Sequence, residues 1–191
     1  KYMDVQLYHA WLNEFCSMLK DNATVLEVAC GPGNITRYLL DKRPDLKITG
    51  TDLSPNMLAL ARVNNPEAEF ELMDAKDIGA RGKQYDAILC GFCLPYLSKE
   101  EAVGLISDSV KALKTGGVIY ISTMEDEYGK SGWTKSSKGD ELYMYYHEAG
   151  CLTNALTINN YKIVSLKRQP YPANDGTKVT DMVILARLIR S

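Results

Sequence analysis

Five short apolar runs rich in β-branched residues alternate with helical segments, and this alternation limits the possible fold more than any other feature. The runs are 24–29, 47–51, 70–73, 85–90 and 118–123. Between them, apolar residues recur at helical spacing, as at 35–40 and 55–63. Strands joined by crossover helices pair in parallel within one sheet. We therefore predict an α/β fold with an open, mostly parallel sheet and helices on both of its faces.

The segments outside this alternation add helices and a hairpin. Helical spacing predicts an amphipathic helix over 4–20, and a capping-box pattern predicts another over 98–114. The polar stretch 124–140 is expected to be a loop, and 147–158 reads as a helix. Two β runs close the chain, at 161–168 and 179–188, and a turn rich in Pro, Asn, Asp and Gly separates them. They predict an antiparallel C-terminal hairpin, which brings the total to seven strands.

Composition excludes several classes of protein. Apolar residues make up 46% of the 191 residues, and 22 Lys and Arg against 24 Asp and Glu give a net charge of −2. No apolar run approaches the roughly 18 residues of a membrane span. The lack of a basic excess argues against a nucleic-acid partner. The odd count of five cysteines, without a visible secretion signal, favours reduced thiols and a cytoplasmic location. The chain begins at Lys1 and not at Met, so we expect a few leading residues or a tag to be missing.

Polar and glycine residues follow three successive strands. Gly31-Pro32-Gly33 comes after the first run, Asp52 after the second, and Asp74 after the third. Ligands of open parallel sheets bind beyond the carboxyl ends of the strands. An acid about 20 residues after a glycine turn accepts hydrogen bonds from ribose hydroxyls in nucleotide sites. The sequence therefore predicts a site for a nucleotide-like ligand at this edge.

Five motifs carry a resemblance to the class I S-adenosylmethionine-dependent methyltransferases that act on small molecules. They are VLEVACGPG at 25–33, GTDLSPNM at 50–57, MDA at 73–75, YDAILC at 85–90 and LKTGGV at 113–118. The resemblance implies a Rossmann-like, seven-stranded fold. It also implies a single methyltransferase domain over 1–191 with three parts: an N-terminal cap (1–20), a cofactor-binding core (24–123), and a substrate-side loop, helix and closing hairpin (124–191).

The resemblance also implies S-adenosylmethionine as cofactor and a role for each motif residue. Carried onto this chain, the methionine portion is held by Glu27, by the turn from Gly31 to Gly33, and by the Cys90 backbone. The adenosine portion is held by the remaining motif residues, which are Asp52 at the ribose, Leu53 and Met57 beside the adenine, and Asp74 and Ala75 at its edge. Ala29 stands where the family usually has a glycine. No metal is needed, because the sulfonium is already activated.

The acceptor side is less defined by the sequence. Aromatic residues that are candidates for the substrate pocket are Tyr8, Trp11, Tyr96, Trp133, Tyr145 and Tyr146. For all of them except Tyr96, packing in the core or in a loop is the alternative. His147 and Tyr96 are candidates for a general base. The usual phenol pKa near 10 favours substrate orientation as the role of Tyr96. Cys90 and Cys93 have redox-motif spacing, but we interpret them as incidental buried thiols.

The expected function is methyl transfer from S-adenosylmethionine to an O, N or C atom of a small molecule. One alternative is a protein that binds this cofactor without catalysis. Another is a nicotinamide-dinucleotide oxidoreductase, although the turn lacks the last glycine of the dinucleotide pattern and Asp74 would have no role. Aminopropyl transfer on a similar fold is a further, minor alternative.

Overall fold

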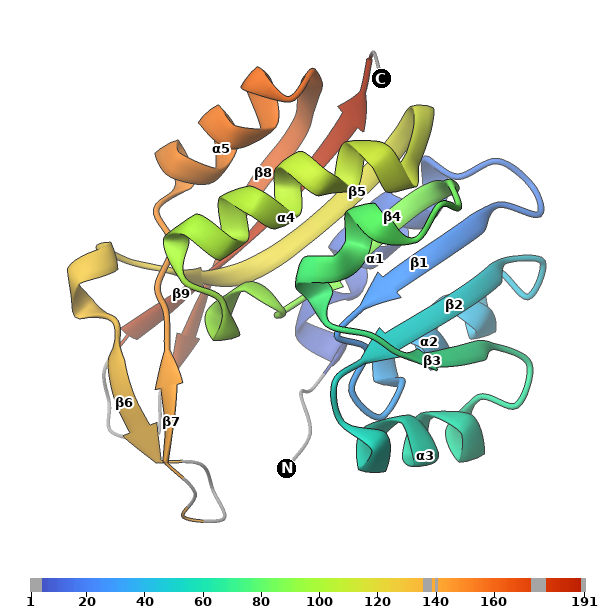
Figure 1. Ribbon diagram of the computed structural model, residues 1–191, viewed down its shortest axis with the longest axis horizontal. Helices are drawn as coiled ribbons and strands as arrows, with labels where there is room; N and C mark the ends of the chain where they lie inside the picture. The colour runs from blue at the N-terminus through green and yellow to red at the C-terminus, as the bar shows by residue number, and fades with distance from the viewer. Residues whose placement is uncertain (1–4, 136–138, 140, 173–177, 190–191) are drawn as a thin grey trace.

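A computed structural model describes residues 5–135, 139, 141–172 and 178–189. Its main sheet has seven strands in the order β3-β2-β1-β4-β5-β9-β8 (Figure 1). The first five are parallel, and β9 pairs antiparallel with both β5 and β8. The strands are β1 (Thr24–Val28), β2 (Lys47–Asp52), β3 (Glu69–Leu72), β4 (Tyr85–Gly91), β5 (Leu113–Glu125), β8 (Tyr161–Pro172) and β9 (Lys178–Leu188). The predicted fold class is confirmed.

Helices cover both faces of this sheet because successive strand residues point to opposite sides. On one face, Val25 and Leu89 pack with α1 (His9–Ser17) and α2 (Asn34–Lys42). On the other, Leu26 and Ile88 pack with the helices that cross in front of the sheet in Figure 1, α4 (Lys99–Ala112) and α5 (Ala149–Ile158). A separate small cluster seats α3 (Pro55–Asn64) against Phe70 and Cys30.

The helix boundaries follow the predicted capping signals at most places. The Ser54 hydroxyl accepts from the Met57 N–H at 3.3 Å and Pro55 opens α3. Ser98 and Glu101 form the predicted capping box of α4. However, α4 ends at Ala112 and not at 114, because β5 begins at Leu113. The glycine pair at 116–117, which was expected to end the helix, lies inside β5, at a register shift of the β4–β5 ladder.

Two expectations about the connecting segments are wrong. The opening segment is not one helix over 4–20; among the described residues it is a short 3₁₀ turn, η1 (Val5–Tyr8), followed by α1. The stretch 124–140, expected to be a loop, contains a 3₁₀ turn, η4 (Tyr128–Lys130), and the strand β6 (Gly132–Lys135). β6 pairs antiparallel with β7 (Glu141–Met144), which follows that stretch, and the two form a small sheet. This small sheet lies away from the main sheet (Figure 1). Two further 3₁₀ turns are η2 (Ala75–Ala80) and η3 (Leu94–Tyr96).

No helix in the described part of the chain is both long and apolar enough to cross a membrane.

Candidate functional site

A cavity of about 540 Å³ opens at the carboxyl ends of β1, β2 and β4. Small-molecule sites in proteins enclose roughly 300–1,000 Å³, so its size suits a nucleoside-like ligand. It lies where the strand order reverses between β1 and β4, which is the usual ligand position in open α/β sheets. The lining residues that later paragraphs use are Glu27, Ala29, Cys30, Gly31, Asp52, Leu53, Ser54, Met57, Met73, Asp74, Ala75, Phe92, Cys93 and Tyr96.

The turn after β1 brings the backbone to the cavity through positive φ angles. Ala29 and Gly31 both have φ of 55°, and Gly33 has φ of 79°. The Cys30 N–H donates to the Thr51 carbonyl at 2.8 Å, which ties the turn to β2. Gly33 is not among the residues that line the cavity. A Cβ there would lie 2.3 Å from the Asn65 side chain, so this glycine permits the close approach of α2 and α3.

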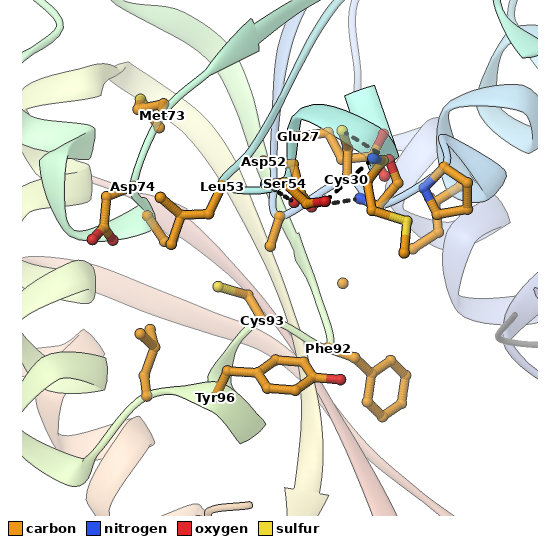
Figure 2. Close-up of a pocket in the computed structure, with 18 of the residues that line it drawn as sticks. Glu27, Cys30, Asp52, Leu53, Ser54, Met73, Asp74, Phe92, Cys93 and Tyr96 are labelled. Atoms are coloured by element: carbon orange, nitrogen blue, oxygen red, sulfur yellow. Dashed lines mark hydrogen bonds between the residues drawn. The ribbon is translucent and has the colours of Figure 1, made fainter. Parts of the chain in front are cut away.

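The Asp52 carboxylate joins the end of β2 to two neighbouring backbones. One oxygen accepts from the Gly31 N–H at 2.9 Å, and the other accepts from the Ser54 N–H at 2.8 Å (Figure 2). A carboxylate has about four lone-pair positions, so two remain for a ligand hydroxyl pair. Asp52 therefore presents acceptor capacity to the cavity while its orientation is fixed by the turn.

Glu27 is a buried carboxyl at the base of the cavity. Its side chain is 1% exposed and accepts a short hydrogen bond from the Thr36 hydroxyl of α2. Burial raises the pKa of Glu27 to about 7, and the negative charge of Asp52 adds to this effect while Thr36 opposes it. A cationic group of a ligand in the cavity would favour the ionised form.

The far end of the cavity combines an apolar slot with a second acid. Leu53 is 63% exposed there, and Met57 and Met73 also line the cavity. Asp74 begins η2, and one of its oxygens accepts from the Lys76 N–H at 3.0 Å. Apolar side chains beside an acid suit a flat heterocycle with an exocyclic amino group.

The remaining wall follows β4 and lies opposite Asp52 and Ser54 (Figure 2). It includes Phe92, Cys93 and Tyr96. The Cys90 side chain is fully buried in the core, and the cavity lining along this strand begins at the next residue, Gly91. Burial raises the pKa of Cys93 to about 12, so this thiol stays protonated and unreactive near neutral pH.

Most of the aromatic candidates for the acceptor side lie outside the lining of this cavity. Tyr96 lines it. Tyr8 is 4% exposed and its ring lies 5.8 Å from that of Trp11. On the small sheet, Trp133 is 74% exposed. The two residues after β7 are held by backbone bonds, because the N–H groups of Tyr145 and Tyr146 donate to the Pro95 carbonyl at 2.8 Å and the Ser131 hydroxyl at 3.1 Å.

His147 is also away from the cavity lining. It is 2% exposed, and its Nε2 lies 2.8 Å from the Leu94 carbonyl of η3. Burial lowers the pKa of His147. The ring therefore ties the segment after β7 to the turn that carries Tyr96, and its role as a general base stays a prediction.

Several lining residues were missed in the sequence. Cys30, Ser54 and Met73 lie inside the quoted motifs, next to residues that were given a role, so their position near a strand end was the available signal. Phe92 follows β4 in the same way, but its φ of 55° has no sequence signature, because aromatic residues seldom adopt this conformation.

The donor set fits S-adenosylmethionine on chemical grounds. A buried acid at one end suits an ammonium, Asp52 suits a ribose, and the slot beside Asp74 suits an adenine. Within the described ranges, no group of three or more His, Cys, Asp or Glu residues is arranged to hold a metal ion.

Fold and cavity together define a Rossmann-like protein with a small-molecule site at the switch point of its sheet. Residues 25–117 match the family model described as a methyltransferase domain. Trans-aconitate 2-methyltransferase of Variovorax paradoxus is 38% identical over 103 residues, which are 54% of this chain and 39% of that protein. Malonyl-[acyl-carrier protein] O-methyltransferase of Acetivibrio thermocellus is 32% identical over 106 residues, 54% of this chain and 36% of that protein.

The chain thus spans less than half the length of these relatives. Among solved structures, a SAM-dependent methyltransferase of Methanosarcina mazei superposes with a TM-score of 0.79 at 18% identity, covering 92% of this chain and 96% of that one. At this identity the superposition shows the fold. Residues 25–117 are thus similar to the methyltransferase-domain family, and the fold is that of a known S-adenosylmethionine-dependent methyltransferase.

Proposed function

We propose that this protein transfers the methyl group of S-adenosylmethionine to an O, N or C atom of a small molecule. The observation that carries the proposal is the single cavity that unites the buried acid Glu27, the glycine turn and the fixed carboxylate of Asp52 at the ends of neighbouring strands. The match of residues 25–117 to the methyltransferase-domain model supports the same function.

In this proposal, each cavity residue binds one part of the cofactor. Glu27, Ala29 and the Gly31 backbone bind the methionine portion, with Gly33 shaping the turn and the end of β4 at Cys90 bordering it. Asp52 binds the ribose. The adenine lies among the remaining residues, which are Leu53, Met57, Asp74 and Ala75.

The bound cofactor supplies an activated methyl group on a sulfonium. The protein's residues then have two tasks, which are to align the acceptor with that methyl group and to exclude water. We assign Tyr96 to acceptor orientation, because it lines the cavity on the wall opposite Asp52. Whether the acceptor loses a proton depends on its chemistry, and His147 is the proposed base only for that case.

The identity of the acceptor is not carried over from the relatives. Their names give trans-aconitate for one and malonyl-[acyl-carrier protein] for the other, so a shared core serves different acceptors. We also propose that residues 1–20, 24–123 and 124–191 form one domain, as cap, core and substrate side. All five cysteines carry free thiols, which supports a cytoplasmic protein.

Calorimetric titration with S-adenosylhomocysteine, beside NAD, tests the cofactor class. We expect saturable binding of S-adenosylhomocysteine and none of NAD. Asp52→Ala should abolish the binding of S-adenosylhomocysteine. Glu67→Gln also removes one negative charge, but at an exposed residue outside the cavity lining, and should leave the binding unchanged. Binding of NAD alone would replace the proposal with the dinucleotide alternative.

Catalysis is tested separately from binding. Transfer of radiolabelled methyl groups into a metabolite extract should occur with the wild-type protein and not with Asp52→Ala. Tight binding without any incorporation across extracts would favour the non-catalytic alternative.

A further inference from the structure

Asp181 is a buried carboxyl that the proposed site does not use. It lies on β9 opposite Met124 of β5, toward the same edge of the sheet as the cavity. Its side chain is 4% exposed, and it accepts a hydrogen bond of 2.5 Å from the Tyr8 hydroxyl of η1. The two residues are 173 positions apart in the sequence, so this bond joins the beginning of the described chain to its last strand.

Tyr8 in turn contacts the cavity wall. Its ring meets the Phe92 ring edge to face, with centroids 5.1 Å apart. Phe92 lines the cavity on the wall opposite Asp52, as Figure 2 shows. A chain of contacts therefore runs from Asp181 through Tyr8 to the surface that a bound cofactor would meet.

Phe92 needs such support because its backbone is strained. Its φ of 55° lies in the left-handed region, which is unfavourable for a residue with a Cβ. Its N–H is held by Ser122 of β5, whose carbonyl and hydroxyl oxygens each lie 3.1 Å away. Ser122 fixes the backbone and Tyr8 contacts the ring, so the two together determine where the ring lies.

The carboxylate of Asp181 is a poor source of stability at this place. Burial raises its pKa, and the Tyr8 hydroxyl offsets part of that effect. Burying a charged group costs free energy that one hydrogen bond rarely recovers in full. The effect of the pair is on position. The short hydrogen bond between these two buried side chains fixes the place of η1 on the sheet edge.

We propose that Asp181 and Tyr8 are positioning residues that hold η1 against the sheet edge and thereby fix Phe92 as a wall of the cofactor cavity. This inference rests on the proposed function, because it assumes that the cavity takes an adenosine-containing cofactor. Neither side chain lines the cavity, so both act through Phe92.

Affinity for S-adenosylhomocysteine, measured by calorimetry, tests the inference. Tyr8→Phe keeps the ring and removes the hydroxyl, and we expect affinity to fall about tenfold, the size of one lost buried hydrogen bond. Asp181→Leu should have the same effect. Asp181→Asn should restore affinity to within about twofold of wild type, because the Asn carbonyl accepts the Tyr8 hydrogen bond.

Tyr161→Phe provides the matched control. The Tyr161 hydroxyl makes a buried hydrogen bond of 2.7 Å with Ser109, in the core on the other face of the sheet. Its loss should lower the melting temperature as Tyr8→Phe does, yet leave the affinity unchanged. Equal affinity in Tyr8→Phe, Asp181→Leu and wild type would overturn the inference while the proposed function stands. A wild-type protein that does not bind S-adenosylhomocysteine would overturn both.

Tryptophan emission gives a second reading that does not depend on a ligand. Trp11 lies beside Tyr8, and the only other tryptophan is the exposed Trp133. In a Trp133→Phe background, Tyr8→Phe and Asp181→Leu should shift the emission to the red and increase quenching by acrylamide. Asp181→Asn and Tyr161→Phe should not. An unchanged spectrum in the first two variants would contradict the positioning of η1 by this pair.

Discussion

The carboxylate of Asp52 accepts a hydrogen bond from the Gly31 N–H across 2.9 Å, so the acid at the end of β2 holds the turn that follows β1. Its second oxygen accepts from Ser54 at the start of the next helix. Asp52 is therefore part of the scaffold of the site as well as a candidate ligand residue, and its substitution should be felt before any cofactor binds.

We first predict a loss of stability in Asp52→Ala without ligand. Two backbone donors lose a charged acceptor, and the expected cost is about 2–3 kcal/mol in the free energy of unfolding, measured by urea denaturation. Asp74→Ala is the control. Its carboxylate caps the short turn η2 and pairs with the exposed Lys76 side chain at 3.6 Å, so its loss should cost about 1 kcal/mol. Equal midpoints for Asp52→Ala and wild type would show that the turn does not need this acid.

The two glycines of the turn should respond differently to alanine. In Gly31→Ala, the added Cβ has no neighbouring atom within 4 Å, and only the strain of φ 55° remains. We therefore expect a cost of about 1 kcal/mol in the free energy of unfolding. Gly33→Ala adds a Cβ 2.3 Å from Asn65 and 3.4 Å from Ala61 at φ 79°, and should cost about 2–4 kcal/mol. Urea denaturation of both variants measures the difference, and a reversed order would contradict the packing of α2 on α3.

Glu27 should make stability depend on pH. Burial raises its pKa from the usual 4.5 to about 7, so between these values the folded state holds a proton that the unfolded state has released. The contribution of Glu27 to stability is therefore full below pH 4.5, declines as pH rises toward 7, and is constant above. Glu27→Gln removes this contribution, and its stability relative to wild type, from urea denaturation across pH 5–8, should rise with pH. A constant difference would exclude the raised pKa.

Ligand binding should show the opposite trend with pH at the same residue. If Glu27 binds the ammonium of S-adenosylhomocysteine as proposed, affinity should increase as the carboxyl ionises near pH 7. Calorimetry from pH 6 to 8 measures the increase, and Glu27→Gln should bind more weakly with a flatter profile. A wild-type profile as flat as that of the variant would move the ammonium away from Glu27.

His147→Gln tests whether this ring is structural. Its Nε2 contact with the Leu94 carbonyl ties the segment after β7 to η3, so we expect a stability loss of about 1–3 kcal/mol from a disturbed buried partner. Affinity for S-adenosylhomocysteine should stay within about twofold of wild type, because the ring does not line the cavity. A loss of labelled methyl transfer, with stability and affinity intact, would instead support the general-base prediction.

The sequence predicts the core of the fold because its signals are local. Each of the five parallel strands is marked by an apolar run bounded by a turn or a helix cap. Four of these runs agree with the observed strands to within one residue, and the fifth lies inside β5, which begins five residues earlier. The small sheet of β6 and β7 could not be predicted in this way. Trp133 and Tyr143 pair across it while staying largely on the surface, so no apolar alternation marks its strands.

The candidate site likewise has a part that the sequence predicts and a part that it does not. Asp52 and the Gly31 turn are readable because adjacent parallel strands bring their carboxyl ends to one edge. The pair of Tyr8 and Asp181 is not, because it depends on how a hairpin 173 positions away inserts into the sheet. Partners so distant in sequence leave no periodic pattern in either segment.

The insertion of β9 between β5 and β8 limits how early the sheet can form during synthesis. β9 lies between β5 and β8, so residues 178–188 must leave the ribosome before the edge of β5 is covered. Until then, a long apolar strand with unpaired backbone groups is open to other chains. A nascent polypeptide of this protein should thus depend on chaperones until synthesis has passed β9.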